Sequence, residues 1–186
     1  MGVIFENKDD FEEVYLPNLR QKYNFDINMA RDLYYNWLTL GRITGTDFFN
    51  KLGIPTSTNF IRGLIIDPEF PEFASKIKDK YKLSVLSNDA VEWSQILRKT
   101  YGLDEFVDNY FVSGSLGYRK PDKSAYIKVF DLLKAKPSDC TVVDNISQNL
   151  DSPQILGCKT IHFDRKSSNN VVKNFQELYE RLMQIE

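Results

Sequence analysis

The segment "CTVVDNISQNLDSPQILGCKTIHF" (residues 140–163) gives the strongest indication of the architecture. It reads as a buried strand that ends on Asp144, a short helix over 149–156 that Gly157 stops, and a second strand over 159–163. Strand, helix and strand in that order predict a parallel pair of strands. In open parallel sheets the chemistry lies at the carboxyl ends of the strands, so Asp144 is the first candidate site residue.

The same alternation of strand and helix patterns extends outward over residues 67–186. Helical periodicity alternates there with short β-runs, which include "LSVLSN" and "NYFVSG". At the other end of the chain, "GVIFE" (residues 2–6) reads as the first strand, and it ends on the acid Glu6. We therefore expect an α/β fold with a Rossmann-like, three-layer core and a parallel sheet, built from residues 1–8 and 67–186.

Residues 10–66, directly after the predicted first strand, show a different pattern. Apolar residues fall three and four positions apart on one helix face, at Ile27, Ala30, Leu33, Tyr34, Trp37 and Leu38. Gly41 is placed to end that helix, and Thr46 is placed to cap the next one. Since this stretch has no strand pattern, we expect a small all-helical cap subdomain inserted into the core.

Composition limits the kinds of partner. The 186 residues are 42% apolar and carry a net charge of -2, with 24 basic and 26 acidic residues interspersed. This balance gives no electrostatic footprint for nucleic acid, and no apolar run approaches the ~20 residues of a membrane span. The two cysteines, Cys140 and Cys158, suggest neither a disulfide framework nor a zinc site. We expect a cytoplasmic protein whose partner is a small molecule or another protein.

Polar side chains gather where the predicted strands and their loops end. They are an acid, a hydroxyl, an amide, a lysine and a second acid, namely Glu6, Ser87, Asn88, Lys120 and Asp144. The hydroxyl and the amide could hold phosphoryl oxygens, and the lysine could neutralise developing charge. Paired carboxylates could hold a magnesium ion. This combination favours phosphate chemistry.

These segments resemble the haloacid dehalogenase (HAD) superfamily of hydrolases, in the branch that carries a helical cap after the first strand. "VIFE" resembles the first motif of that family, "SVLSND" the second, "LGYRKPDKSAY" the third and "VVDNISQNLDSPQILGCKTI" the fourth. "GRITGTDFFNKLGI" is similar to the closing helix of the cap. The resemblance covers essentially the whole chain. It implies a phosphatase that works through a phosphoaspartyl intermediate and a magnesium ion.

The resemblance also implies a role for each candidate residue. The catalytic positions are Glu6, Lys8, Ser87, Lys120 and Asp144. The substrate-binding positions are Ser87, Asn88 and Lys120. The magnesium positions are Glu6, Asp144 and Asn145.

Three of these positions depart from the family pattern. Glu6 stands where the nucleophilic Asp belongs, Lys8 where the acid/base Asp belongs, and Asn145 where a second metal-binding Asp belongs. A Glu carboxylate lies roughly 1 Å off the in-line position, which can cost on the order of a hundredfold, and loss of the acid/base costs roughly a hundredfold to ten-thousandfold more. We therefore predict a catalytically impaired member, a pseudoenzyme, that binds a phosphate-bearing small molecule or a protein. Magnesium binding should be weak or absent, with the Lys8 ammonium paired to Glu6 or Asp144 in the metal's place.

Two active alternatives remain open. The first is a phosphomonoester phosphatase that works with these atypical residues. The second is a metal-independent 2-haloacid dehalogenase, although that branch also needs the initial Asp that Glu6 replaces. A response-regulator receiver is disfavoured, because it would not carry a large helical insertion after the first strand. Specificity in such folds lies in cap residues that no motif marks, so the substrate is not identified.

Overall fold

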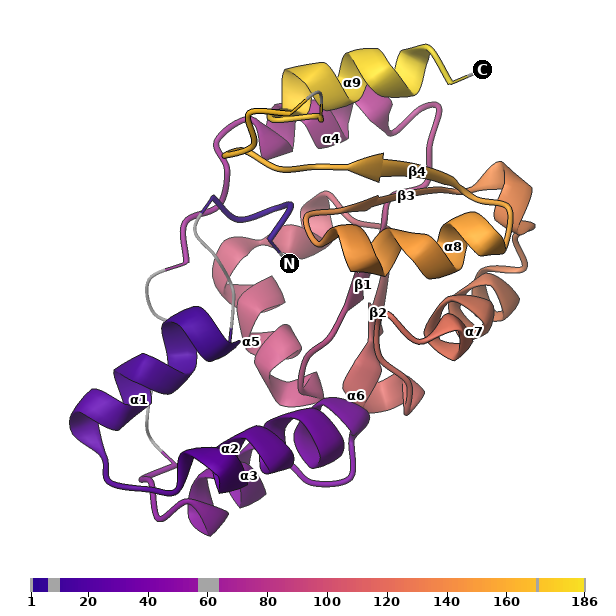
Figure 1. Cartoon of the computed structure of the whole chain (residues 1–186). Helices are drawn as coiled ribbons and strands as arrows, with labels where there is room; N and C mark the ends of the chain where they lie inside the picture. Colours follow the sequence, from indigo (N-terminus) through magenta and orange to yellow (C-terminus); the bar gives the residue numbers. More distant parts are fainter. Residues whose placement is uncertain (1, 7–10, 57–63, 170, 186) are drawn as a thin grey trace.

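The structure is a computed structural model of the chain and describes residues 2–6, 11–56, 64–169 and 171–185. Lys8 lies outside the described residues, so its predicted pairing stays a prediction. Figure 1 shows a group of helices at the lower left and an arrangement of strands and helices above and to the right of it.

The strands follow the predicted β-runs and pair in parallel. Their bounds are β1 (Ser84–Ser87), β2 (Asn109–Val112), β3 (Thr141–Asp144) and β4 (Lys159–His162). β1 pairs with β2, and β3 pairs with β4, so the described strands form two two-stranded parallel sheets. Ser87 is the last residue of β1 and Asp144 is the last residue of β3, so both lie at the carboxyl ends of their strands.

The prediction of a first strand over residues 2–6 is wrong. This segment is turned, and it pairs only through an isolated antiparallel bridge between Phe5 and Ile66. The Arg165 guanidinium explains the conformation, because it donates to the carbonyl oxygens of Gly2 at 3.0 Å and Val3 at 2.7 Å. In a strand, successive carbonyls point to opposite sides, so two consecutive carbonyls that converge on one side chain cannot join a ladder.

Helices cover both faces of the strands, as expected for a three-layer α/β core. The helix bounds are α1 (Leu16–Lys22), α2 (Ile27–Asp32), α3 (Gly45–Lys51), α4 (Phe70–Ile77), α5 (Val91–Tyr101), α6 (Ser113–Leu116), α7 (Lys123–Leu133), α8 (Asp151–Ile155) and α9 (Phe175–Met183). On one face, Val85 and Val143 pack in the core cluster that includes α4, α5 and α9. On the other face, Leu86 and Val142 pack against α7. α7 therefore bridges β1 and β3.

The stretch from Phe11 to Lys51 is helical, as predicted. It comprises α1, α2, α3 and the helical turns Phe11–Tyr15, Leu33–Trp37 and Leu38–Leu40. Gly41 ends the helical segment that begins with α2, and it has the left-handed conformation with φ 69°. The cap of α3 is Thr44 rather than Thr46, since the Thr44 hydroxyl and the Asp47 carboxylate form a reciprocal capping box. The division into a cap (10–66) and a core (1–8 and 67–186) stays a prediction.

Aromatic side chains and two glycines join this helical stretch to α5 and α6. The Trp93 ring of α5 lies 5.9 Å from both the Phe48 and the Phe49 rings, centroid to centroid. At Gly41 an added Cβ would come within 1.8 Å of the Gly114 carbonyl oxygen, so the two backbones touch. These contacts fix the helical stretch against the strand-bearing part of the fold.

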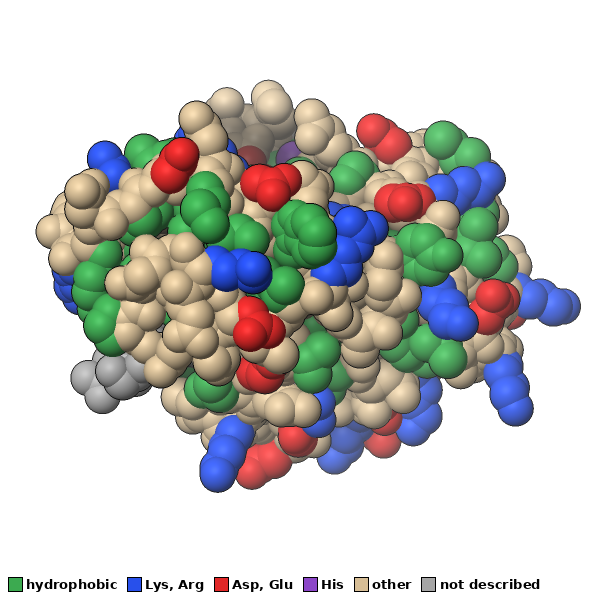
Figure 2. Space-filling model, turned by 90° about the horizontal axis from the view of Figure 1, so that it is seen from below, with side chains coloured by type: hydrophobic (Ala, Val, Ile, Leu, Met, Phe, Trp, Pro, Cys, Tyr) green, Lys and Arg blue, Asp and Glu red, His purple; other side chains and the backbone are tan. Residues whose placement is uncertain are grey.

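The surface carries charges of both signs. Figure 2 views the molecule from below, and it shows basic and acidic side chains interspersed with apolar ones on that face. Among the described residues, none of the helices combines the length and the apolar character that a membrane crossing requires.

Candidate functional site

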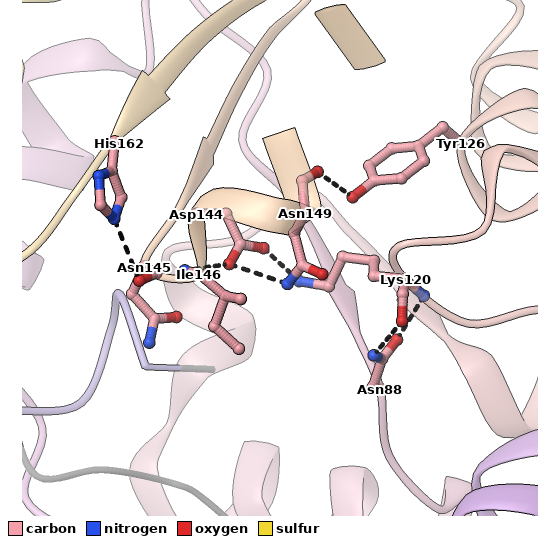
Figure 3. A network of polar contacts seen from close by, with 8 residues as sticks. All are labelled: Asn88, Lys120, Tyr126, Asp144, Asn145, Ile146, Asn149 and His162. Carbon is pink, nitrogen blue, oxygen red and sulfur yellow. Dashed lines mark hydrogen bonds and ion pairs between the residues drawn. The ribbon is translucent and has the colours of Figure 1, made fainter. Parts of the chain in front are cut away.

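The carboxyl ends of β1 and β3 bring most of the predicted site residues together. Asn88 follows β1 directly, Asp144 ends β3, and Lys120 comes from the loop between α6 and α7. Figure 3 shows the three side chains in one network of polar contacts. The structure therefore brings these three predicted residues together, although Lys120 lies 24 residues from Asp144 in the chain.

The centre of the network is an ion pair between Lys120 and Asp144. The Lys120 Nζ atom lies 2.6 Å from Asp144 Oδ2, and the two side chains are 14% and 4% exposed. The other carboxylate oxygen, Oδ1, accepts hydrogen bonds from the Ile146 backbone N–H at 2.9 Å and from the Asn149 side-chain amide at 3.0 Å (Figure 3). Both oxygens of Asp144 are thus engaged.

These contacts set the charge state of Asp144. Burial by itself would raise the pKa of the carboxyl, but the Lys120 ammonium and the hydrogen bonds to Ile146 and Asn149 outweigh burial and hold the pKa below its ordinary value. Asp144 is therefore ionised at neutral pH and forms a charge-assisted contact with Lys120.

The side chain of Asn88 contacts the backbone of Lys120. Its side-chain amide donates to the Lys120 carbonyl oxygen at 2.8 Å, and its side-chain oxygen accepts from the Lys120 backbone N–H at 2.8 Å. Since both ends of the amide are engaged with the backbone of one residue, Asn88 positions Lys120. Its direct contact with substrate stays a prediction.

Two further residues support the network and were missed from the sequence. The Tyr126 hydroxyl of α7 donates to the Asn149 carbonyl oxygen, and Asn149 in turn donates to Asp144 (Figure 3). Burial raises the pKa of Tyr126, and the nearby Asp144 charge raises it further, so the hydroxyl stays a donor. The spacing of Asn149 five residues after Asp144 was visible in the sequence, whereas nothing in the local pattern marked Tyr126.

The remaining predicted residues lie around this network. Glu6 is exposed, and its backbone N–H donates to the Ile65 carbonyl oxygen at 2.9 Å. Ser87 is buried at the end of β1, with 3% of its surface exposed. Asn145 lies against Gly2, where an added Cβ would come within 2.7 Å of the Asn145 amide nitrogen. The Asn145 carbonyl oxygen is 3.3 Å from Nε2 of His162 (Figure 3).

A cavity of about 470 Å³ opens over the network. One part of its lining is polar and includes Glu6, Asn88, Arg119, Lys120, Asp144 and Asn149. Another part is aromatic and includes Phe11, Tyr34, Tyr35 and Trp93. Ser87 is not among the lining residues, so its predicted contact with substrate stays a prediction. The cavity lining combines charges of both signs, amides and aromatic surface, which suits a small organic molecule with polar groups.

Two of the predicted magnesium ligands, Asp144 and Asn145, have other contacts in this structure. Mg²⁺ needs several oxygens at about 2.0–2.1 Å in octahedral geometry. Both Asp144 oxygens are already hydrogen-bonded, one of them to a cation, and Asn145 brings no charge. Within the described ranges, no group of three His, Cys, Asp or Glu side chains is placed to hold a metal ion.

Comparisons with known proteins agree on the fold. A family model described as haloacid dehalogenase-like hydrolase matches residues 11–148. The chain is similar to a HAD family enzyme from Bacteroides thetaiotaomicron in complex with magnesium and inorganic phosphate, with 18% identity, a TM-score of 0.72, and 91% of this chain and 93% of that chain covered.

Two other solved structures have the same architecture. One is a HAD phosphatase from Thermococcus onnurineus, with 16% identity, a TM-score of 0.69, and 98% of this chain and 94% of that chain covered. The other is an L-2-haloacid dehalogenase, with 19% identity, a TM-score of 0.62, and 89% and 83% covered. At such identities the likeness shows the fold alone, whereas the family model spans most of the chain. The chain belongs to the haloacid dehalogenase-like hydrolases.

Proposed function

We propose that this chain binds a phosphate-bearing small molecule in the cavity over Lys120 and does not hydrolyse it. Magnesium binding is weak or absent in this proposal. The observation that carries it is the contact of 2.6 Å between Lys120 Nζ and Asp144 Oδ2. This contact puts a cation where a metal-binding carboxylate oxygen would have to be free.

The ion pair leaves Lys120 able to bind an anion. An ammonium carries three N–H donors. Asp144 takes one of them, and no other described residue accepts from Lys120 Nζ. The Asn88 amide fixes the lysine backbone from the other side. Lys120 therefore has two further N–H donors for a phosphoryl oxygen in the cavity that it lines.

Hydrolysis lacks the groups that the family pattern requires. Glu6 replaces the nucleophilic Asp and Asn145 replaces a metal-binding Asp. Without a metal, two anions, the attacking carboxylate and the phosphoryl group, would approach each other with only the already paired Lys120 between them. Such like-charge approach in a partly buried site is strongly unfavourable, so binding without turnover is the function that this arrangement supports best.

The test is an assay with 4-nitrophenyl phosphate, with and without Mg²⁺. We expect no nitrophenolate release above the buffer rate, while the same compound binds in a calorimetric titration. Magnesium-dependent release that Asp144→Ala abolishes would show an active phosphatase and overturn the proposal. Halide release from 2-chloropropionate without magnesium would overturn it in favour of a dehalogenase.

A further inference from the structure

Arg119, which precedes Lys120 in the chain, is a partly buried cation without a carboxylate partner among the described residues. Its guanidinium carbon lies 4.6 Å from the centre of the Tyr35 ring. Its Nη1 atom donates to the Tyr35 carbonyl oxygen at 3.4 Å, which is a long hydrogen bond. Its Nε atom is buried and has no hydrogen-bond partner in the part of the chain that the structure describes. Arg119 lines the same cavity as Lys120.

Other arginines of this chain show which group the Nε and Nη2 atoms of an arginine bind. Arg31, Arg98 and Arg165 each use Nε and Nη2 together to bind a carboxylate. Arg31 binds the Glu12 carboxylate through Nε at 2.9 Å and through Nη2 at 2.8 Å. Arg98 binds the Asp104 carboxylate through Nε at 2.7 Å and through Nη2 at 3.1 Å. In Arg119 this edge is left unfilled by the described residues.

Because Arg119 is partly buried, leaving its Nε and Nη2 donors without an acceptor is energetically unfavourable. Burial lowers the pKa of Arg119, and the neighbouring Tyr34 and Tyr35 only partly offset burial. The group nevertheless remains charged at neutral pH, because arginine does not lose its proton in proteins. A buried N–H without an acceptor and a cation without a counter-ion both favour the arrival of an anion.

We propose that Arg119 binds a carboxylate of the ligand, so that the ligand is a small organic phosphate with a second, carboxylic acid group. This inference rests on the proposed function, which places the phosphate at Lys120. A planar guanidinium edge matches a carboxylate in two parallel hydrogen bonds. To present both N–H groups the guanidinium has to shift, and the long contact with the Tyr35 carbonyl is weak enough to be given up.

The aromatic wall of the cavity suits the part of the ligand between the two anions. Phe11 and Tyr34 are stacked with ring centroids 3.7 Å apart, and Trp93 lies 6.4 Å from Tyr34. All three residues line the cavity with Arg119. This apolar part of the lining, beside two cations, favours an apolar body over a highly hydroxylated one.

The experiment compares inorganic phosphate, phenyl phosphate and the 2-, 3- and 4-carboxyphenyl phosphates by calorimetry. The three isomers vary the separation between the two anions. We expect at least one isomer to bind about tenfold more tightly than phenyl phosphate. In Arg119→Met this advantage should disappear, and the affinity for inorganic phosphate should fall by a smaller factor than the affinity for the best isomer. Arg42→Met, which removes an exposed arginine outside the cavity lining, is the matched control and should leave all affinities unchanged.

The outcomes separate the two proposals. If inorganic phosphate and phenyl phosphate do not bind, the proposed function fails. If they bind but no isomer gains more than twofold, Arg119 does not bind a carboxylate. An equal loss for all probes in Arg119→Met would show a purely structural role and overturn the inference. The comparison of probes on the unmodified protein holds even where the variant does not fold.

Discussion

Replacing Lys120 with methionine should destabilise the protein strongly at neutral pH. The substitution keeps the length and apolar stem of the side chain but removes the ammonium 2.6 Å from Asp144. Asp144, whose side chain is 4% exposed, is then left as a buried charge with two hydrogen bonds and no counter-ion. Breaking a buried pair by removing one partner costs about 3–5 kcal/mol.

The loss should depend on pH in a defined direction. In the unmodified protein the pKa of Asp144 is held below its ordinary value, so the pair stabilises the fold above that value, and its contribution is lost as pH falls through the folded pKa. Without the Lys120 ammonium, burial raises the folded pKa of Asp144 relative to the unmodified protein. The difference in stability between the two proteins is therefore largest at neutral pH and shrinks in acid.

The assay is thermal and urea unfolding at pH 7 and at pH 3.5. For a chain of this length, about 3–5 kcal/mol corresponds to a fall in melting temperature of roughly 10 °C. Lys82→Met is the matched control, because Lys82 pairs with Asp108 at 3.3 Å but is 81% exposed. Its loss should cost less than about 1 kcal/mol. A Lys120→Met protein as stable as the control at pH 7, or a deficit that grows in acid, would refute this reasoning.

Two further predictions concern the supports of the site. Gly41→Ala should destabilise the protein more than Gly53→Ala. Both glycines have left-handed backbones, but only at position 41 would the added Cβ come within 1.8 Å of the Gly114 carbonyl oxygen. Equal melting temperatures of the two variants would contradict the close contact between Gly41 and Gly114. Asn88→Ala should lower the melting temperature and weaken phosphate binding severalfold, since the Lys120 loop loses two hydrogen bonds of 2.8 Å; unchanged phosphate affinity in a calorimetric titration would show that Asn88 does not position the lysine.

Most of the α/β elements could be predicted from sequence because their signals are local. The helix pattern at Phe70, Phe73 and Ile77 and the β-run that ends on Ser87 appear in the structure as α4 and β1. The sequence also indicated that the loop of Lys120 and the end of the Asp144 strand lie near each other, and the two side chains are in contact in the structure.

The prediction of a first strand was wrong because the conformation of residues 2–6 depends on a residue far away in the chain. The apolar run Val3 to Phe5 meets every requirement of a strand, but Arg165 captures its carbonyl oxygens from 160 or more residues away. The interaction of Arg165 with Asp67 at 2.6 Å holds the guanidinium in that position. The sequence pattern of residues 2–6 does not predict this contact with Arg165.

The capping residue of α3 and the contact of Asn88 with the Lys120 backbone were missed for different reasons. Thr44 with Asp47 three positions later was a readable capping signal, and the prediction of Thr46 overlooked it. The engagement of the Asn88 amide with the Lys120 backbone depends on how a loop folds, which residue types alone do not reveal.

Phosphate binding at Lys120 without a magnesium ion can be measured by titrating inorganic phosphate into the unmodified protein at low salt, with and without Mg²⁺. We predict weak binding, with a dissociation constant on the order of 1 mM, that is the same in both buffers and weakens as salt is added. Phosphate binding that appears only with magnesium, or that tightens tenfold or more in its presence, would contradict the account.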